Sequence, residues 1–328
     1  MRSSEAEIEK RKVALIAFGG NALIERGKEG KQTEQLDNAE KVAEILSDIV
    51  EKGYDLVLVH GNGPQVGNIL IQVEEAVTKV PPLSLDICVA QSEGSIGYML
   101  EKALINSFRK RGISKDIITI LTEVEVRKDD PAIQNPTKPI GPFYTSYRAE
   151  YLMMNKGWHM VEDSGRGYRK VVPSPKPVSI LKMNIIKNFV DSGHVVIAAG
   201  GGGIPVYRDE AGFLHGIEAV IDKDYAAAFI AKELGVDLFV ILTDIDNVFI
   251  NYGKKNQKEV HQLSLKDARK YFSQGQFPPG SMGPKVEAAI DFVEATGREV
   301  LITSMRAVRE ALEGKAGTFI SIQLALPR

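Results

Sequence analysis

Two lysines of this sequence stand where their ammonium groups could meet an anion. Lys223, followed by Asp224, opens an alanine-rich helix predicted within VIDKDYAAAF (220–229), and Lys285 lies in the first turn of another, within GSMGPKVEAA (280–289). Lysine is unfavourable at a helix N-terminus, because the helix dipole is positive there. Two helices that both begin this way indicate a shared anion, although each lysine could instead point into water.

Phosphoryl transfer is the chemistry that such lysines could serve. The protein's part in it is to position the migrating group and neutralise its charge, with little covalent work. Lysine suits this part because it is a compact charge on a flexible stem. Asp224 could hold and orient Lys223, or it could be an ordinary aspartate at the start of a helix.

A third lysine, Lys138, lies in NPTKPIGP (135–142), between Pro136 and Pro139. Prolines suppress helix and remove backbone donors, so this stretch is predicted to be a stiff, extended loop. Taken alone, it is more typical of a solvated turn than of a binding site.

Three glycine loops each follow a predicted strand directly. Glycine lets backbone N–H groups approach an anion closely, and the helix that follows adds a favourable dipole. In open α/β sheets, ligands bind at the carboxyl ends of the parallel strands, where such loops gather. The loops therefore predict a phosphate-bearing ligand. Their residues are Gly19, Gly20 and Asn21 in FGGNA (18–22), Gly61, Asn62 and Gly63 in HGNGPQ (60–65), and Gly200, Gly201 and Gly202 in GGGG (200–203).

The loops match neither of two common phosphate-binding motifs. The sequence has no G-x-x-x-x-G-K-[ST] stretch, which excludes a Walker-type P-loop. Gly61, Gly63 and Gly67 imitate a dinucleotide fingerprint with one residue too many, and no acidic residue follows where a ribose partner would be needed. Asn21 and Asn62 can donate amide hydrogens without adding charge, which suits a small anionic substrate, though either could be a turn residue.

The segment LTDIDNVFINYG (242–253) is a candidate for nucleotide contacts. Asp244 and Asp246 could face a nucleotide or its Mg²⁺, and Tyr252 could pack on a base. Each of the three could equally be a turn former or a core residue.

The elements that position these residues alternate along the chain. Apolar runs without polar alternation are typical of strands buried on both faces of a parallel sheet, and β-α-β alternation places helices on both faces. The predicted fold class is therefore α/β, a three-layer αβα sandwich with an open, largely parallel central sheet. The predicted strands are 12–18, 54–60, 116–121, 194–199, 237–242 and 299–303, and the clearest helices, each ended by glycine, are the one before Gly53, 222–235 and 285–297.

One region, from about 127 to 177, breaks this rhythm. It is rich in proline and charge, contains Lys138, and shows no clear buried strand. It is predicted to be a small protruding subdomain inserted into the sandwich. Aromatic and apolar side chains could form its modest core: Phe143, Tyr144, Tyr147, Tyr151, Leu152, Met153 and Trp158.

Length and composition narrow the possible classes of function. The 328 residues allow one large domain with an insertion, or two domains, and the net charge of −2 argues against a nucleic-acid or anionic-membrane partner. The single cysteine, Cys88, is more typical of a small apolar helix residue than of a reactive thiol, and it fits a cytoplasmic location. No apolar run is long enough to cross a membrane, and MRSSEAEIEKRK (1–12) lacks the apolar region of a secretory signal.

Together these stretches resemble the amino acid kinase superfamily and, within it, the carbamate kinase family. The matching stretches run in order over nearly the whole chain. They are GGNAL (19–23), HGNGPQVGN (60–68), QSEGSIGYM (91–99), NPTKPIGPF (135–143), EDSGRGYRKVVPSPKP (162–177), GGGGIPV (200–206), EAVIDKD (218–224), INYGK (250–254) and GSMGPKVEAAI (280–290).

The resemblance implies a reaction and an organisation. The reaction is the reversible transfer of a phosphoryl group from ATP to carbamate, giving ADP and carbamoyl phosphate, with Mg²⁺ bridged mainly by the nucleotide phosphates. The chain would be one domain over 1–328, with the subdomain at 127–177, and it would form a homodimer. A lobe at about 1–195 would bind carbamate or carbamoyl phosphate, and a lobe at about 196–328 would bind ATP or ADP.

The resemblance also implies roles for the residues singled out above. Lys223 and Lys285 would grip the migrating phosphoryl group, and Asp224 would organise them. The protruding subdomain would close over carbamoyl phosphate, with Lys138 as its substrate lysine. The nucleotide pocket would lie around Thr243, Asp244, Tyr252, Met282 and Lys285.

The first strand separates this sequence from other members of the superfamily. Members that act on acetylglutamate, glutamate, aspartate or UMP usually carry a lysine just ahead of the first glycines, where this chain has Ala17 and Phe18. Lys138 is the natural replacement for that cation.

Three other functions remain open from the sequence. They are an amino acid kinase of other specificity, such as acetylglutamate kinase; a catalytically silent nucleotide- or phosphate-sensing module; and a nicotinamide-dependent dehydrogenase. The silent module would be expected to lack one of the three lysines, and the dehydrogenase is suggested only by the spacing of Gly61, Gly63 and Gly67. The direction of the kinase reaction is also open, because ATP formation during arginine breakdown and carbamoyl phosphate synthesis use the same residues.

Overall fold

The computed structural model describes residues 11–24, 28–163 and 165–324. Most of the stretch in which no secretory signal was expected, residues 1–10, lies outside this range, as does Ser164 of the predicted subdomain.

An eight-stranded sheet forms the centre of the molecule. Six neighbouring strands run parallel, and they are the six predicted from continuous apolar runs. At one end of the sheet, β17 runs antiparallel to β16 and parallel to β15. In spatial order the strands are β15 (Gln262–Ser264), β17 (Thr318–Ser321), β16 (Val300–Ser304), β12 (Leu238–Thr243), β1 (Lys12–Phe18), β2 (Tyr54–His60), β9 (Val195–Ala198) and β3 (Ile117–Ile120).

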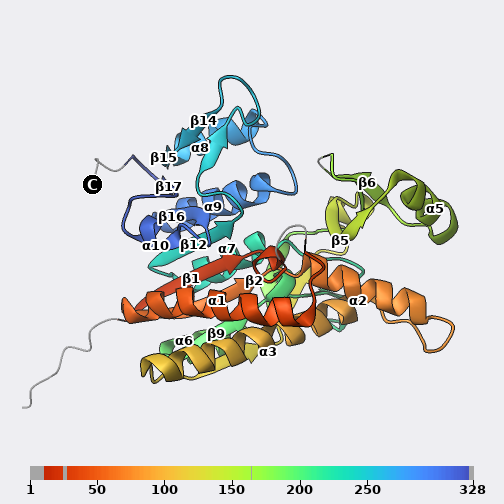
Figure 1. The fold of residues 1–328 in the computed structure, drawn as a ribbon, viewed down its shortest axis with the longest axis horizontal. Helices are drawn as coiled ribbons and strands as arrows, with labels where there is room; N and C mark the ends of the chain where they lie inside the picture. Colours follow the sequence, from red (N-terminus) through yellow and green to blue (C-terminus); the bar gives the residue numbers. More distant parts are fainter. Residues whose placement is uncertain (1–10, 25–27, 164, 325–328) are drawn as a thin grey trace, which may run out of the picture.

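Helices cover both faces of this sheet, which confirms the predicted sandwich (Figure 1). One face packs against α6 (Met183–Asp191), α7 (Lys223–Leu234), α8 (Leu265–Ser273) and α9 (Met282–Thr296). The other packs against α1 (Gln32–Glu51), α3 (Leu85–Arg111) and α10 (Val308–Leu312). As predicted, α7 and α9 end at glycines with left-handed backbone, Gly235 and Gly297. No helix in the described part of the chain is both long and apolar enough to span a membrane.

The three glycine loops lie along one edge of the sheet. They follow β1, β2 and β9, which are adjacent and parallel, so their carboxyl ends point the same way. The first and third loops form short 3₁₀ turns, η1 (Gly20–Ala22) and η2 (Gly200–Gly202), and the second leads into α2 (Gly63–Ala76). This gathering confirms the expectation drawn from the positions of the loops.

Two smaller sheets flank the centre. Four strands, in the order β11 (Leu214–Gly216), β10 (Ile204–Arg208), β4 (Glu123–Val126) and β8 (Pro177–Ile180), form one of them. The hairpin of β13 (Val248–Ile250) and β14 (Lys258–Val260) forms the other.

The region predicted as a subdomain contains a sheet of its own, which corrects the expectation of no clear strand there. Three antiparallel strands project from the main body, with α5 beside them (Figure 1). They are β5 (Lys138–Tyr144), β7 (Tyr168–Val172) and β6 (Met160–Glu162), accompanied by α4 (Pro131–Gln134) and α5 (Ser146–Lys156). Lys138 therefore opens a strand instead of lying in an isolated loop, although its extended backbone was predicted.

The core of the subdomain is smaller than its aromatic content suggested. Leu152 and Trp158 are buried with Ala149 and Met160, and Tyr144 and Met153 pack against them. Phe143, Tyr147 and Tyr151 are exposed, so their assignment to the core was wrong. The count of apolar residues predicted a core, but it could not tell which face of α5 would be turned inward.

A contact between two glycines seats the subdomain on the main body. A Cβ added at Gly67, on α2, would lie 2.0 Å from the Cα of Gly141, on β5. Only glycine at position 67 allows the helix and the strand to approach so closely. Around this contact, Val66 of α2, Ile140 of β5 and Val172 of β7 share a buried cluster with the start of α3.

We expect Gly67→Ala to destabilise the protein by about 1–3 kcal/mol, because backbone atoms must move to admit the methyl group. Gly94→Ala, in the middle of α3, is the matched control, since the added methyl group would meet a methyl group of Leu121 at an ordinary distance of 4.0 Å. That variant should be more stable by about 0.5–1 kcal/mol, from helix propensity alone. Free energies of urea unfolding test both, and equal values for the two variants would contradict the glycine contact.

Candidate active site

The carboxylate of Asp224 joins the two lysines that were predicted to share an anion. Its Oδ1 accepts a hydrogen bond from Lys223 Nζ at 2.5 Å, and its Oδ2 accepts one from Lys285 Nζ at 3.1 Å. Asp224 and Lys223 open α7, and Lys285 lies in the first turn of α9 and also donates to the carbonyl of Ser281. One buried carboxylate thus fixes the separation and direction of two ammonium groups.

The stem of Lys223 runs beside the first two glycine loops. A Cβ at Gly61 would lie 3.2 Å from Lys223 Cδ and 2.9 Å from the backbone nitrogen of Gly20, and a Cβ at Gly19 would lie 4.0 Å from Lys223 Cε. A larger residue at position 61 would therefore push the loops apart or displace the lysine. This close packing brings the ammonium group of Lys223 to the edge where the loops gather.

Lys138 enters the same site through Asp222, a residue that the sequence did not single out. Lys138 Nζ donates to Asp222 Oδ2, across 84 positions in the chain. The other carboxylate oxygen, Oδ1, accepts from the backbone nitrogen of Asp224 at 3.0 Å and caps α7. An aspartate just before a predicted helix is a readable capping signal, but its pairing with a distant lysine is not.

The charges of this cluster shift one another's pKa values. Burial would raise the pKa of Asp222, but the ammonium groups of Lys138, Lys223 and Lys285 outweigh it and hold that pKa well below its ordinary range. Burial lowers the pKa of Lys223 despite its pairing with Asp224. Burial also acts to lower the pKa of Lys285, but the two aspartates outweigh it and the pKa is raised.

Three ammonium groups are in direct contact with two carboxylates in this cluster, so the ion pairs alone leave one ammonium charge in excess, and the carboxylate of Asp244 lies farther off. A buried excess charge is costly unless a partner of opposite sign arrives. The arrangement is therefore matched to an anion that enters between the lysines and the glycine loops.

The third glycine loop contacts the second loop and the segment that leads into α7. A Cβ at Gly201 would lie 2.1 Å from Asn62 Nδ2, and a Cβ at Gly202 would lie 2.3 Å from the carbonyl oxygen of Ile221. Asn62 itself is buried, and its amide donates to Ser92 Oγ at 2.8 Å. Asn21 is exposed. A role for either amide in binding an anion stays a prediction.

Two buried titratable residues, Glu93 and His60, pack against the third loop. Glu93 of α3 accepts hydrogen bonds from the backbone nitrogens of Gly200 at 2.9 Å and Thr122 at 3.3 Å. Burial raises the pKa of Glu93 to about 8 and lowers that of His60, at the end of β2, to about 4. At neutral pH both side chains are therefore mainly uncharged beside the loop.

The residues expected to hold a nucleotide are spread more widely. Asp244 follows β12 and helps to raise the pKa of Lys285, so it lies near the cluster, and the buried Met282 opens α9 three residues before Lys285. Thr243 ends β12. Tyr252 lies beyond β13, 61% exposed, with its ring 6.1 Å from that of Phe249.

Asp246, the other aspartate of that segment, is engaged within the protein. It accepts hydrogen bonds from Ser304 Oγ at 2.5 Å and from Arg306 at 2.9 Å. Of the roles left open for it, which were a nucleotide contact, a turn former and a core residue, the turn former fits these contacts best.

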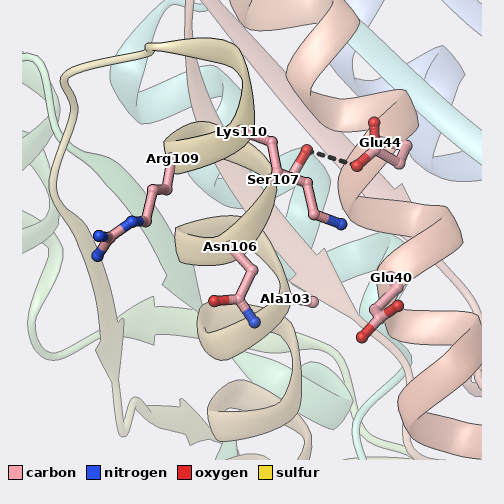
Figure 2. Close-up of a pocket in the computed structure, with 7 residues that line it drawn as sticks. All are labelled: Glu40, Glu44, Ala103, Asn106, Ser107, Arg109 and Lys110. Carbon is pink, nitrogen blue, oxygen red and sulfur yellow. Dashed lines mark hydrogen bonds between the residues drawn. The ribbon is translucent and has the colours of Figure 1, made fainter.

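A cavity of about 400 Å³ lies elsewhere, between α1 and α3 (Figure 2). It is lined by Glu40 and Glu44 of α1 and by side chains between Ala103 and Lys110 of α3, and Ser107 bonds to Glu44 at 3.0 Å. The three lysines of the cluster and the glycine loops are not among the residues that line it, so it is separate from the anion site.

Comparison with known proteins shows which family this chain belongs to. The family model described as "Amino acid kinase family" matches residues 12–304. The chain belongs to the amino acid kinase family. A carbamate kinase of Pyrococcus furiosus is 46% identical over 309 residues, covering 94% of this chain and 98% of the relative.

Solved structures agree with this membership. A carbamate kinase from Giardia lamblia bound to citric acid has a TM-score of 0.90 and 41% identity, over 95% of this chain and 99% of its own. The same enzyme bound to AMP-PNP has a TM-score of 0.86 and 42% identity, with the same coverage.

In this amino acid kinase, no cluster of three or more histidine, cysteine, aspartate or glutamate side chains suited to a metal lies among the described residues. Asp222 and Asp224 are both engaged by lysines. The described side chains therefore do not fit a metal held by the protein alone.

We expect Glu93→Gln to remove a pH-dependent loss of stability in this kinase. Because folding raises the pKa of Glu93 from 4.5 to about 8, the folded protein holds its proton more tightly, and the wild type loses unfolding free energy as the pH rises through that window. The variant has no such proton, so its stability relative to the wild type should increase between pH 5 and pH 8. Urea unfolding of both proteins at the two pH values measures this, and the same difference at both would contradict it.

Proposed function

We propose that this amino acid kinase transfers a phosphoryl group reversibly between ATP and carbamate, giving ADP and carbamoyl phosphate. The relatives described above are carbamate kinases that match nearly the whole chain at more than 40% identity. The reaction requires a site for a small phosphorylated anion beside a site for a nucleotide. The lysine cluster and the glycine loops are suited to the first of these.

The observation that carries the proposal is the position of Lys138. Strand β1 ends in Ala17 and Phe18 and offers no cation to the loop that follows it. Lys138 reaches the α7 end of the site from β5 instead, where it pairs with Asp222. A lysine brought in by the subdomain is what the resemblance to carbamate kinases implied.

The geometry supports a mechanism without a protein nucleophile. Carbamate is already anionic, so the chain has to place the two substrates in line and stabilise the charge of the group in transfer. Lys223 and Lys285, oriented by Asp224, would flank that group. Backbone N–H groups of the loops at Gly19–Gly20 and Asn62–Gly63 would hold the phosphate oxygens, with Lys138 as the third cation; the N–H group of Gly61 instead donates to the carbonyl of Phe18.

Mg²⁺ is part of the proposal as a partner of the nucleotide. When bound, it neutralises charge on the phosphate oxygens of ATP or ADP. Met282, Asp244 and Lys285 lie at the start of α9 and the end of β12, and we assign the nucleotide phosphates to this side of the cluster. Thr243 and Tyr252 complete the proposed nucleotide contacts.

A homodimer and a cytoplasmic location also belong to the proposal. The homodimer is implied by the resemblance, and the location is favoured by the single, buried cysteine, Cys88. Both directions of the reaction use the same residues, so a role in arginine breakdown and one in carbamoyl phosphate synthesis are equally compatible with the site.

A coupled assay for ATP formed from ADP and carbamoyl phosphate tests the reaction itself. N-acetylglutamate with ATP serves as the competing substrate pair, because acetylglutamate kinase is the nearest alternative. ATP formation with carbamoyl phosphate and no phosphorylation of acetylglutamate is the expected result. The reverse pattern would overturn the proposal.

Lys285→Ala should lower kcat by on the order of 100-fold or more, because a donor that stabilises the transferred charge is lost. Lys266→Ala removes an exposed lysine of α8 and should leave kcat unchanged. Steady-state kinetics of both variants measure the difference. Near-normal turnover in Lys285→Ala would remove this residue from the mechanism.

Lys138→Ala should raise the KM for carbamoyl phosphate by on the order of tenfold or more, as expected for the loss of a hydrogen bond to a charged group. The KM for ADP should change much less, since the nucleotide is assigned to the other side of the cluster. An unchanged KM for carbamoyl phosphate would place Lys138 outside the substrate site.

A further inference from the structure

We propose that Asp222 is an internal counter-ion for Lys138, which it holds in the substrate-free protein and releases to the phosphate of the incoming anion. Asp222 is then a positioning residue that sets how tightly the site binds anions. This inference rests on the proposed function in assigning Lys138 to the substrate phosphate.

The two oxygens of Asp222 have separate tasks. Oδ1 accepts from the backbone nitrogen of Asp224 at 3.0 Å, which caps α7, while Oδ2 accepts from Lys138 Nζ. The side chain of Asp222 is 8% exposed and that of Lys138 is 20% exposed, so the pair is largely shielded from water. A shielded ion pair is held more strongly than a pair on the surface.

The backbone around the pair is fixed on both sides. Lys138 pairs with Val172 across β5 and β7, and the backbone nitrogen of Val220 donates to the carbonyl of Pro173 at 2.9 Å. Val220 lies two residues before Asp222, and Pro173 directly follows Val172. This hydrogen bond therefore ties the backbone before Asp222 to the strand that pairs with Lys138. Because both backbones are held in this register, the position of the ion pair is fixed by the fold and not only by the flexible lysine side chain.

A phosphate that binds Lys138 would displace the carboxylate of Asp222 from the ammonium group. Asp224 uses both oxygens on Lys223 and Lys285. Among the described residues, the hydrogen-bond partner of the Lys138 ammonium group is Asp222. A phosphate that takes Lys138 must compete with this carboxylate, so its apparent affinity is reduced by the fraction of time that Lys138 is free.

The pair also suits a site that must release its anion in every turnover. Without Asp222 the ammonium group of Lys138 would have no carboxylate partner, and the site would bind phosphates more tightly and release them more slowly. A carboxylate that takes Lys138 back provides a partner for that cation when the product leaves. Without it, substrate affinity would rise at no gain in kcat, since binding that is equally strong in the ground state does not accelerate the chemical step.

Binding of inorganic phosphate, measured by isothermal titration calorimetry, tests the proposal without any turnover. Four proteins are compared: wild type, Asp222→Asn, Lys138→Ala and the double variant. Asparagine keeps an oxygen for the cap of α7 and removes the charge that holds Lys138. We expect Asp222→Asn to lower the Kd for phosphate on the order of tenfold, and we expect this gain to vanish in the Lys138→Ala background.

Two results would overturn the proposal: an unchanged or higher Kd in a folded Asp222→Asn variant, or an equal gain in both backgrounds, which would reflect net charge alone. Asp222→Thr, which also caps a helix, replaces Asp222→Asn if that variant fails to fold, as judged by its thermal transition. In turnover, the KM of Asp222→Asn for carbamoyl phosphate should be lower than that of the wild type, without a rise in kcat. If Asp222 served only as a helix cap, the substitution would raise this KM instead. A wild type that binds phosphate but makes no ATP from carbamoyl phosphate would count against the proposed function and not against the counter-ion.

Discussion

Three lysines in one site repel each other, and the arrangement of the whole site depends on the two carboxylates between them. Asp224 forms ion pairs with Lys223 and Lys285, and Asp222 forms one with Lys138. Removing one member of such a pair leaves a buried charge without compensation, which is strongly unfavourable. Both carboxylates belong to the start of α7, so the beginning of one helix decides where cations from three separate elements meet.

The sheet brings the remaining parts to that helix. Because β1, β2 and β9 are neighbours and run parallel, their glycine loops share one edge, and α7 begins beside them. Contact between Lys223 and the loops requires the absence of a side chain at Gly61. Fold and site are therefore linked by backbone packing as much as by charge, and glycine in these loops shapes the site whether or not every N–H group binds an anion.

Much of this architecture is local in origin, and for that reason it could be predicted. Each of the six parallel strands is a continuous apolar run, and the ends of α7 and α9 are marked by glycines with left-handed backbone. The prediction that Asp224 lies next to Lys223 needed only sequence neighbours. Its contact with Lys285 could be expected because α7 and α9 both carry a lysine in their first turn, and the sheet places the starts of both helices at the same edge.

The features that were missed depend on contacts distant in the sequence or on irregular strands. Strand β5 contains Pro139, Gly141 and Pro142 and shifts its register on β7 between Ile140 and Tyr144, so it has no clean period. The partner of Asp222 is 84 positions away. Glu93 was not singled out from the sequence, because its burial against Gly200 follows only from how α3 crosses the sheet.

The rigid setting of Lys138 now has a fuller physical reason than its flanking prolines. Pairing with β7 and the contact between Gly67 and Gly141 hold the backbone of β5 as well. With the backbone already ordered, a phosphate that binds Lys138 has to restrict only the side chain, and the entropy lost on binding is small. The exchange of the ammonium group from Asp222 to phosphate then requires rotation about side-chain bonds, which is fast compared with movements of whole domains. A cation on a strand whose backbone is already paired and packed can thus serve as an adjustable element of the site.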